Sequence, residues 1–218
     1  ARRIAGVLGS LNSIDPELQN VIQRMKSWDG NLSKGSAEAA IYELFAQSLI
    51  QRLLKETLGD LTIYYSGKGP TPILAEGSIM AERSREWLNH ILDIPNSTWF
   101  DLGKGESRDE ILLMALRETI DVLKHSFRSG IDDWAWGKLH TLTFRHTLGA
   151  VKILEKIFNR GPYPLGGDFD TVWATGSSRY DLSKKDIVGP PFRFIADLSN
   201  WENCLGLLAP GQSGQPAS

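Results

Sequence analysis

The side chains of this sequence best suited to chemistry are two histidines and one aspartate. His140 and His146 are six residues apart, so a β-strand through both would place their imidazoles on one face. A zinc ion would need a third ligand with good geometry, and none lies nearby in the sequence. We therefore interpret both histidines as groups that are hydrogen-bonded within the fold, and we predict no metal site in this chain.

The aspartate, Asp197, lies in an otherwise apolar stretch, where an unpaired carboxylate would be costly. It must face solvent or hold a specific partner. Arg193 is four residues away, which is ~13 Å along a regular strand and too far for a direct ion pair. Two interpretations stay open: a solvated or structurally paired acid, and a residue that orients a group of an active site.

Two glycine-containing segments fall short of known catalytic motifs. Gly166-Gly167-Asp168 lacks the Lys-Ser/Thr and the strand-to-helix setting of a phosphate-binding loop, which favours a tight turn. Residues 211–214, Gly-Gln-Ser-Gly, lack the Gly-x-Ser-x-Gly spacing of a nucleophile elbow. Residue chemistry alone therefore identifies no enzyme.

The elements that must position these residues are mainly helices in the first 160 residues. Four helices are predicted from N-cap signals, at Asp15, Ser36, Ser78 and Ser107. Apolar residues then recur every three or four positions, and the helices are expected to end by residues 28, 59, 94 and 130. Leu61–Tyr65 is a candidate short strand.

After residue 160 the pattern changes to short strands. Glycine and proline become about twice as frequent, and three β-branched, aromatic or aliphatic runs lie between turn residues, at Thr171–Thr175, Phe192–Leu198 and Cys204–Ala209. Strands this short leave open edges that must be paired from elsewhere. We predict an α+β fold in which a mainly helical region, 1–160, precedes a short-strand region, 161–218, both within one larger domain.

Charge and composition exclude several classes of function. The 218 residues include 24 Lys and Arg against 26 Asp and Glu, so no basic excess is available for nucleic acid or an anionic membrane. The longest apolar run, 111–116, is far shorter than the ~20 residues of a membrane span. Cys204 is the single cysteine and cannot form an internal disulfide. We predict no nucleic-acid partner and no membrane span.

A series of short motifs follows in order along the chain. They are Trp28-Asp29-Gly30, Ser36–Phe45, Trp99-Phe100-Asp101, Trp134–His140 with Phe144 and His146, Gly161-Pro162, Gly166-Gly167-Asp168 with Thr171, and residues 193–197 followed by 210–218. In this order they resemble the penicillin acylase (penicillin amidase) family, and the fourth looks like its W-x-W-G-x-x-H-x-x-x-F-x-H signature. The resemblance extends from Trp28 to Ser218.

This resemblance implies an N-terminal-nucleophile hydrolase with an αββα sandwich, cut into two chains. The new N-terminal serine of the second, β chain attacks an amide, and its α-amine, with a pKa of ~7.7–8.0, accepts the hydroxyl proton. The sequence matches the C-terminal part of that β chain and begins with Ala1, whose methyl group has no such chemistry. The nucleophile, the oxyanion-stabilising asparagine and the calcium ligands are expected before Ala1.

The resemblance also implies partners and candidate site residues. Asp197 matches an acid that holds an active-site histidine, and His140 and His146 are further candidates for supporting roles; no residue of this chain is expected to be catalytic itself. The expected partners are the remaining acylase polypeptide, comprising the α chain and the N-terminal part of the β chain, and a small-molecule acyl amide. We expect no cofactor in this chain, and calcium in the complete protein.

The expected function is therefore that of a fragment of an amidohydrolase, inactive alone. The complete enzyme would cleave N-acyl groups from β-lactams or related acyl amides. The alternative is a non-catalytic helical binding or scaffolding module, which would also explain the absence of a nucleophile. The sequence does not predict a compartment, although the precursor could be secreted or periplasmic.

Overall fold

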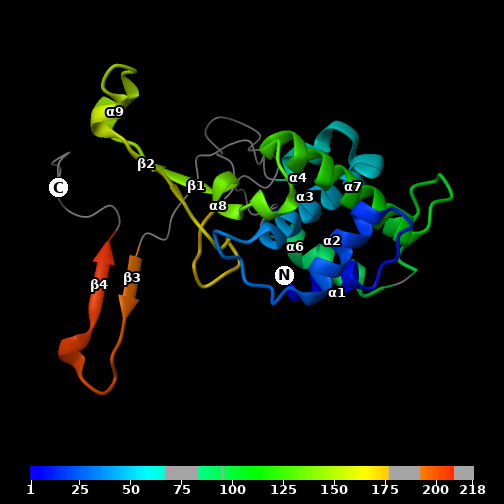
Figure 1. The fold of residues 1–218 in the computed structure, drawn as a ribbon, viewed down its shortest axis with the longest axis horizontal. Helices are drawn as coiled ribbons and strands as arrows, with labels where there is room; N and C mark the ends of the chain where they lie inside the picture. Colours follow the sequence, from blue (N-terminus) through cyan, green and yellow to red (C-terminus); the bar gives the residue numbers. More distant parts are fainter. Residues whose placement is uncertain (67–82, 95, 177–191, 209–218) are drawn as a thin grey trace.

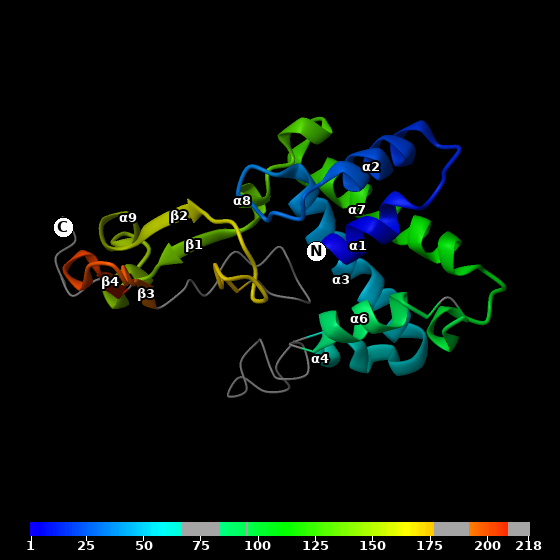
Figure 2. The same cartoon turned by 90° about the horizontal axis from the view of Figure 1, so that it is seen from below.

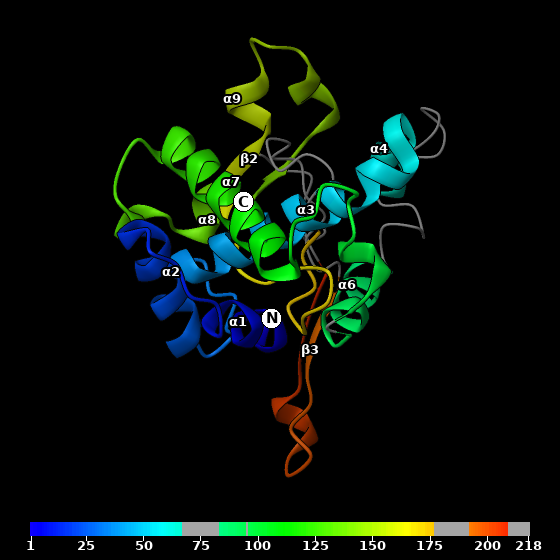
Figure 3. The ribbon, with the colours of Figure 1, turned by 90° about the vertical axis from the view of Figure 1, so that its right-hand side faces the viewer.

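Helix α3 (Ala37–Leu58) lies at the centre of a helical body, and the other helices pack around it (Figure 1). Eight consecutive residues, 39–46, are buried, which is more than two helical turns. A helix that is buried all round must be enclosed by neighbours on every side. Helices α1, α6, α7 and α8 contact it, and the view from one end shows α1, α2, α6 and α7 arranged around it (Figure 3).

The computed structural model describes residues 1–66, 83–94, 96–176 and 192–208. The helices of the body other than α3 are α1 (Arg2–Gly9), α2 (Pro16–Ser27), α4 (Thr62–Tyr65), α6 (Ser84–Leu92), α7 (Arg108–Phe127) and α8 (Trp136–Leu139). Short 3-10 turns lie at Gly59–Leu61, Thr98–Phe100 and Ile131–Asp133. Among the described residues, no helix combines the length and apolarity needed to cross a membrane.

Three of the predicted helix starts are confirmed. Asp15 accepts hydrogen bonds from the backbone of Glu17 and Leu18 at the start of α2, and Ser36 accepts one from Ala39 at the start of α3. Helix α7 begins with the predicted capping box, in which Ser107 and Glu110 each accept a bond from the other's backbone N–H. The fourth start, Ser78, lies outside the described residues, and α6 is described from Ser84.

Two local features differ from expectation. Residues 61–65 were expected to form a strand, but the chain continues as a 3-10 turn and then α4, with the Thr62 hydroxyl bonded to the Gly59 carbonyl. Helix α1 was not predicted, because no side chain caps its start. It forms since Ile4, Ala5 and Leu8 bury one face of it in the core.

Two antiparallel β arms extend from one end of the body (Figures 1 and 2). In the first, β1 (Thr141–Phe144) pairs with β2 (Arg160–Pro164); the segment between them holds the 3-10 turn Thr147–Ala150 and α9 (Glu155–Phe158). In the second, β3 (Phe192–Ile195) pairs with β4 (Leu205–Leu208), and the connection holds the 3-10 turn Trp201–Asn203. Helices and short antiparallel strands together give the predicted α+β class.

The strands are shorter than the sequence indicated. A strand was predicted at residues 192–198, and the observed strand β3 ends at Ile195. A second was predicted at residues 204–209, and the observed strand β4 covers Leu205–Leu208, with Ala209 outside the described residues. The prediction of a strand at residues 171–175 is wrong. The Thr171 hydroxyl bonds to the carbonyls of Asp168 and Trp173, which folds this segment into bends.

The central position of α3 predicts a large effect of truncating it. Leu49 is fully buried, so Leu49→Ala should lower the free energy of unfolding by ~2–5 kcal/mol, through lost burial and a residual cavity. Val122 is half exposed on α7, and Val122→Ala should change it by less than ~0.5 kcal/mol. Urea unfolding followed by circular dichroism measures both. Equal effects of the two substitutions would contradict a core built around α3.

Candidate functional site

A salt bridge is buried where α3 meets α6. Glu43 on α3 accepts a hydrogen bond of 2.6 Å from the guanidinium of Arg85 on α6, and the two side chains are 3% and 10% exposed. The guanidinium carbon also lies 4.9 Å from the centre of the Tyr42 ring, a cation–π distance. Charges this deeply buried must be paired, so the salt bridge fixes α6 against α3.

A second carboxyl group, that of Asp168, reaches the same cluster from the loop after β2. Burial, opposed by Arg85 and reinforced by hydrogen bonding to Asp168, raises the pKa of Glu43 to about 7. Glu43 Oε1 accepts no hydrogen bond from the described residues. The Asp168 carboxyl group is the second acidic neighbour of Glu43 in this cluster. The raised pKa of Glu43 therefore reflects its burial next to a second carboxyl group, only partly offset by the Arg85 guanidinium.

The loop that carries Asp168 is held against the helical body by two glycines. The Gly167 N–H donates to the Leu32 carbonyl at 2.7 Å, and a Cβ on Gly166 would lie 2.6 Å from that same oxygen. Gly167 has a φ of +76°, which favours glycine. Gly166 and Gly167 form a tight turn, as predicted, and they let the loop pack closely against the Leu32 backbone.

His140 is buried behind this loop, next to a hydroxyl group. Its Nε2 lies 2.8 Å from Thr175 Oγ1, and that hydroxyl donates to the Gly166 carbonyl at 2.8 Å. Since the hydroxyl proton is used there, the hydrogen bonds assign a proton to Nε2, and the imidazole is the donor. Burial, opposed by Asp168, lowers the pKa of His140 to about 4. The imidazole is neutral and does not act as a base toward Thr175.

Aromatic stacking completes the surroundings of His140. Its ring lies 4.5 Å from that of Trp136 at an angle of 11°, and Trp136 Nε1 donates to the Gly167 carbonyl at 3.0 Å. These contacts support the structural interpretation of His140. His140 Nδ1 is buried and has no partner among the described residues.

The structure does not bring His146 together with His140. Strand β1 covers residues 141–144 only, so neither histidine lies in it. His146 is exposed beyond the end of β1, where its Nδ1 accepts from the Leu148 N–H at 3.1 Å and its ring stacks 5.0 Å from Phe158. It caps the turn that follows, which is also a structural role.

Asp197 lies in the connection between β3 and β4, two residues beyond the strand that was expected to contain it. Its carboxylate accepts hydrogen bonds from the backbone and hydroxyl of Ser199, the backbone of Asn200 and the amide of Asn203. These bonds, those of Ser199 first, lower the pKa of Asp197 to about 2. The carboxylate organises its own loop, and its role toward an active-site histidine stays a prediction.

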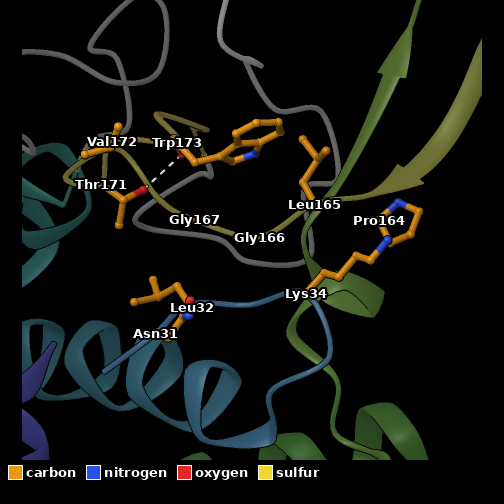
Figure 4. A pocket seen from close by; sticks show the side chains of 10 residues that line it. All are labelled: Asn31, Leu32, Lys34, Pro164, Leu165, Gly166, Gly167, Thr171, Val172 and Trp173. Atoms are coloured by element: carbon orange, nitrogen blue, oxygen red, sulfur yellow. Dashed lines mark hydrogen bonds between the residues drawn. The ribbon is translucent and has the colours of Figure 1, made fainter. Parts of the chain in front are cut away.

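A cavity of about 460 Å³ lies beside the glycine turn. Figure 4 shows Trp173 and Leu165 on one side of it and Leu32 and Asn31 on the other, with Lys34 at its edge. Most of these side chains are apolar. The loop held by the Glu43 cluster thus forms one wall of a small-molecule-sized groove.

Sequence reasoning missed Glu43 and Arg85. Glu43 had a usable signal, because it is the one charged residue between Glu38 and Arg52 in a largely apolar helix. Arg85 had none, since an arginine in an amphipathic helix is ordinarily exposed. In the ranges that the structure describes, no three His, Cys, Asp or Glu side chains gather as metal ligands would.

Comparison with known proteins decides the family. All residues, 1–218, match the family model of penicillin amidase. The chain belongs to the penicillin amidase family. This family assignment confirms the resemblance found in the ordered motifs.

Curated relatives of this penicillin amidase family member carry two names. The acyl-homoserine lactone acylase QuiP of Pseudomonas syringae pv. syringae is 32% identical over 205 residues, covering 89% of this chain and 23% of the relative. QuiP of Pseudomonas fluorescens (Pf-5) is 30% identical with the same coverage. The penicillin acylase 2 proenzyme of Pseudomonas sp. SE83 is 27% identical, covering 98% and 25%. The chain spans about a quarter of the length of these relatives.

The raised pKa of Glu43 predicts a pH dependence of the free energy of unfolding. Its pKa is raised from 4.5 to about 7 on folding, so its protonation stabilises the fold fully below pH 4.5, and this stabilisation is lost as the pH rises through 7. The free energy of unfolding of the wild type minus that of Glu43→Gln should therefore fall over this range. His140, whose lowered pKa changes the free energy of unfolding in the opposite direction, is present in both proteins. Its contribution therefore cancels in the difference. Glu56→Gln, at an exposed carboxyl group that pairs with Lys104, is the matched control.

The contacts of His140 predict a structural, metal-independent role. His140→Ala should lower the free energy of unfolding by ~1–3 kcal/mol, because the Thr175 hydroxyl loses its buried partner. His146→Ala, at the exposed histidine, should change it by less than ~0.5 kcal/mol. Zn²⁺ should leave the melting temperature of the wild type unchanged. A melting temperature that rises with Zn²⁺ concentration would restore the metal-ligand interpretation.

Proposed function

We propose that this chain is part of an acylase that hydrolyses the amide bond of N-acyl homoserine lactones. The observation that supports this most directly is the 32% identity to a protein named acyl-homoserine lactone acylase, over 89% of the chain. Family membership supports the coarser activity, hydrolysis of an acyl amide. The products would be a carboxylic acid and an amine, here homoserine lactone.

In this proposal the chain supplies structure, and the reacting groups lie elsewhere in the polypeptide. Amide hydrolysis needs an activated nucleophile and donors for the oxyanion. Of the described hydroxyls, that of Thr175 lies against a histidine, but its proton is held by the Gly166 carbonyl and the imidazole faces it as a donor. The relatives are about four times as long as the chain, which leaves ample sequence for a catalytic N-terminal residue.

The chain's own contribution would be a rigid wall next to the reaction. The Glu43, Arg85 and Asp168 cluster fixes the turn at 166–167, and that turn positions Trp173 and Leu165 along the groove. An apolar wall of this kind suits an acyl chain, which gains free energy by leaving water. Holding the wall fixed lowers the entropy cost of positioning a substrate.

A β-lactam substrate is the second candidate. It is favoured by the similarity to the penicillin acylase 2 proenzyme, which extends over 98% of the chain at 27% identity. Both candidates share the same reaction, attack on the carbonyl of an acyl amide, and differ in the amine that is released. They are separated by comparing substrates on one protein.

The test is an assay of the full gene product beside the 218-residue chain. N-acyl homoserine lactones with short and long acyl chains, and benzylpenicillin, are each incubated with both proteins, and the released amine is followed by mass spectrometry. The full product should release homoserine lactone with a higher kcat/KM than for benzylpenicillin, and the chain alone should match the buffer background. A full product that releases neither amine would leave the alternative, a non-catalytic binding module.

A further inference from the structure

We infer that the cavity beside the glycine turn binds an aliphatic carboxylate, with the Lys34 ammonium on the carboxylate and with Trp173 and Leu165 on the hydrocarbon chain. The inference deepens the proposed function and rests on it in one respect, that hydrolysis of an acyl amide releases an acid of this class. In the proposed function this chain supplies an apolar wall. Lys34 adds a charge to that wall, and with the charge a preference for an anion over a neutral molecule of the same length.

The cavity has the size and the surface that an alkyl chain requires. Its volume of about 460 Å³ lies in the range of small-molecule sites. The apolar side chains that line it are Leu32, Pro164, Leu165, Val172 and Trp173. Trp173 is 43% exposed and Val172 is fully exposed, so apolar surface faces water there and a hydrocarbon chain that covers it gains free energy.

Lys34 is the single charged side chain among the described residues that line the cavity. It is exposed, and it forms no salt bridge with any residue that the structure describes. Of the acids on the neighbouring loop, Asp168 is buried in the Glu43 cluster and Asp170 is not among the lining residues. A cleft that carries one sign of charge between apolar walls concentrates its field, so this cavity attracts an anion.

The backbone of Lys34 is held in place by two glycines from other segments. The Gly137 N–H donates to the Lys34 carbonyl at 2.7 Å, and a Cβ on Gly137 would lie 2.9 Å from Lys34 Cβ. A Cβ on Gly166 would lie 3.1 Å from the Lys34 backbone nitrogen. Since this backbone is already fixed at the edge of the cavity, binding an anion orders only the lysine side chain, which keeps the entropy cost low.

A carboxylate suits this arrangement better than a phosphate does. Phosphate sites ordinarily combine several donors, often backbone N–H groups at a helix N-terminus. Here the Gly167 N–H is used by the Leu32 carbonyl, and the Thr171 hydroxyl donates to backbone carbonyls of its own loop. One ammonium beside an apolar surface matches one carboxylate at the end of a hydrocarbon chain.

The test is an NMR titration of the full gene product labelled with 5-fluorotryptophan, with no amide present. The fluorine resonance of Trp173, assigned by its loss in Trp173→Phe, reports on the cavity itself. Sodium octanoate should shift this resonance to saturation. 1-Octanol, which has the same chain and no charge, should reach half saturation at a concentration higher by about threefold or more. Added salt should weaken the binding of octanoate and leave that of 1-octanol unchanged.

Variants of Lys34 and Val172 separate the charge from the apolar surface. Lys34→Met should raise the half-saturating concentration of octanoate by about threefold or more and leave that of 1-octanol unchanged. Lys34→Arg keeps the charge and should bind octanoate like the wild type. Val172→Glu, at a fully exposed position, should weaken octanoate relative to Val172→Gln through charge repulsion. Lys152→Met, at an exposed lysine between β1 and β2, is the matched control and should change neither ligand.

Melting temperatures check that the variants fold, and a Lys34→Met protein that melts early is replaced by Lys34→Gln. Equal affinities of the wild type for octanoate and 1-octanol, or an octanoate affinity that the Lys34 and Val172 substitutions leave unchanged, would overturn the inference. Absence of any shift would overturn it as well, because another part of the polypeptide would then fill the cavity. A product that binds octanoate as described but hydrolyses no acyl amide would contradict only the proposed function. One that hydrolyses acyl homoserine lactones without responding to octanoate would contradict only this inference.

Discussion

The structure depends on the need to partner one ionisable side chain, Glu43, in the middle of its most buried helix. A carboxyl group there has no route to solvent, and its burial is tolerable only with a cation beside it. Arg85 brings α6 to it, and Asp168 brings the loop after β2. One buried acid therefore ties together segments that are more than 120 residues apart in the sequence.

The same requirement explains why the groove has a defined wall. The Asp168 loop contacts α3 through its carboxyl group and the 31–34 segment through its two glycines, so it is fixed at both points. His140 then packs beneath the loop as a neutral donor, with Trp136 stacked on its ring. The residues nearest to the groove are thus positioned by polar contacts, while the helices behind them are held by apolar packing.

The sequence was sufficient for features that depend on neighbouring residues. The caps at Asp15, Ser36 and Ser107 are local interactions, and each was read correctly. The stretch at 171–175 was misread because β-branched residues also suit bends that a threonine hydroxyl holds together. The Glu43 cluster joins three distant segments, and no local pattern reports such an encounter. The family, by contrast, was recognisable from ordered motifs without any knowledge of the contacts they make.

The order of elements along the chain affects how the protein folds. Most contacts of the body join helices within the first 139 residues, whereas the hairpin comes last and lies outside that core. Pairing of a strand with a segment distant in the sequence is slow to form. Strands β3 and β4 have no further strand partner among the described residues, and until its edges are covered such a hairpin is the kind of surface on which chains aggregate.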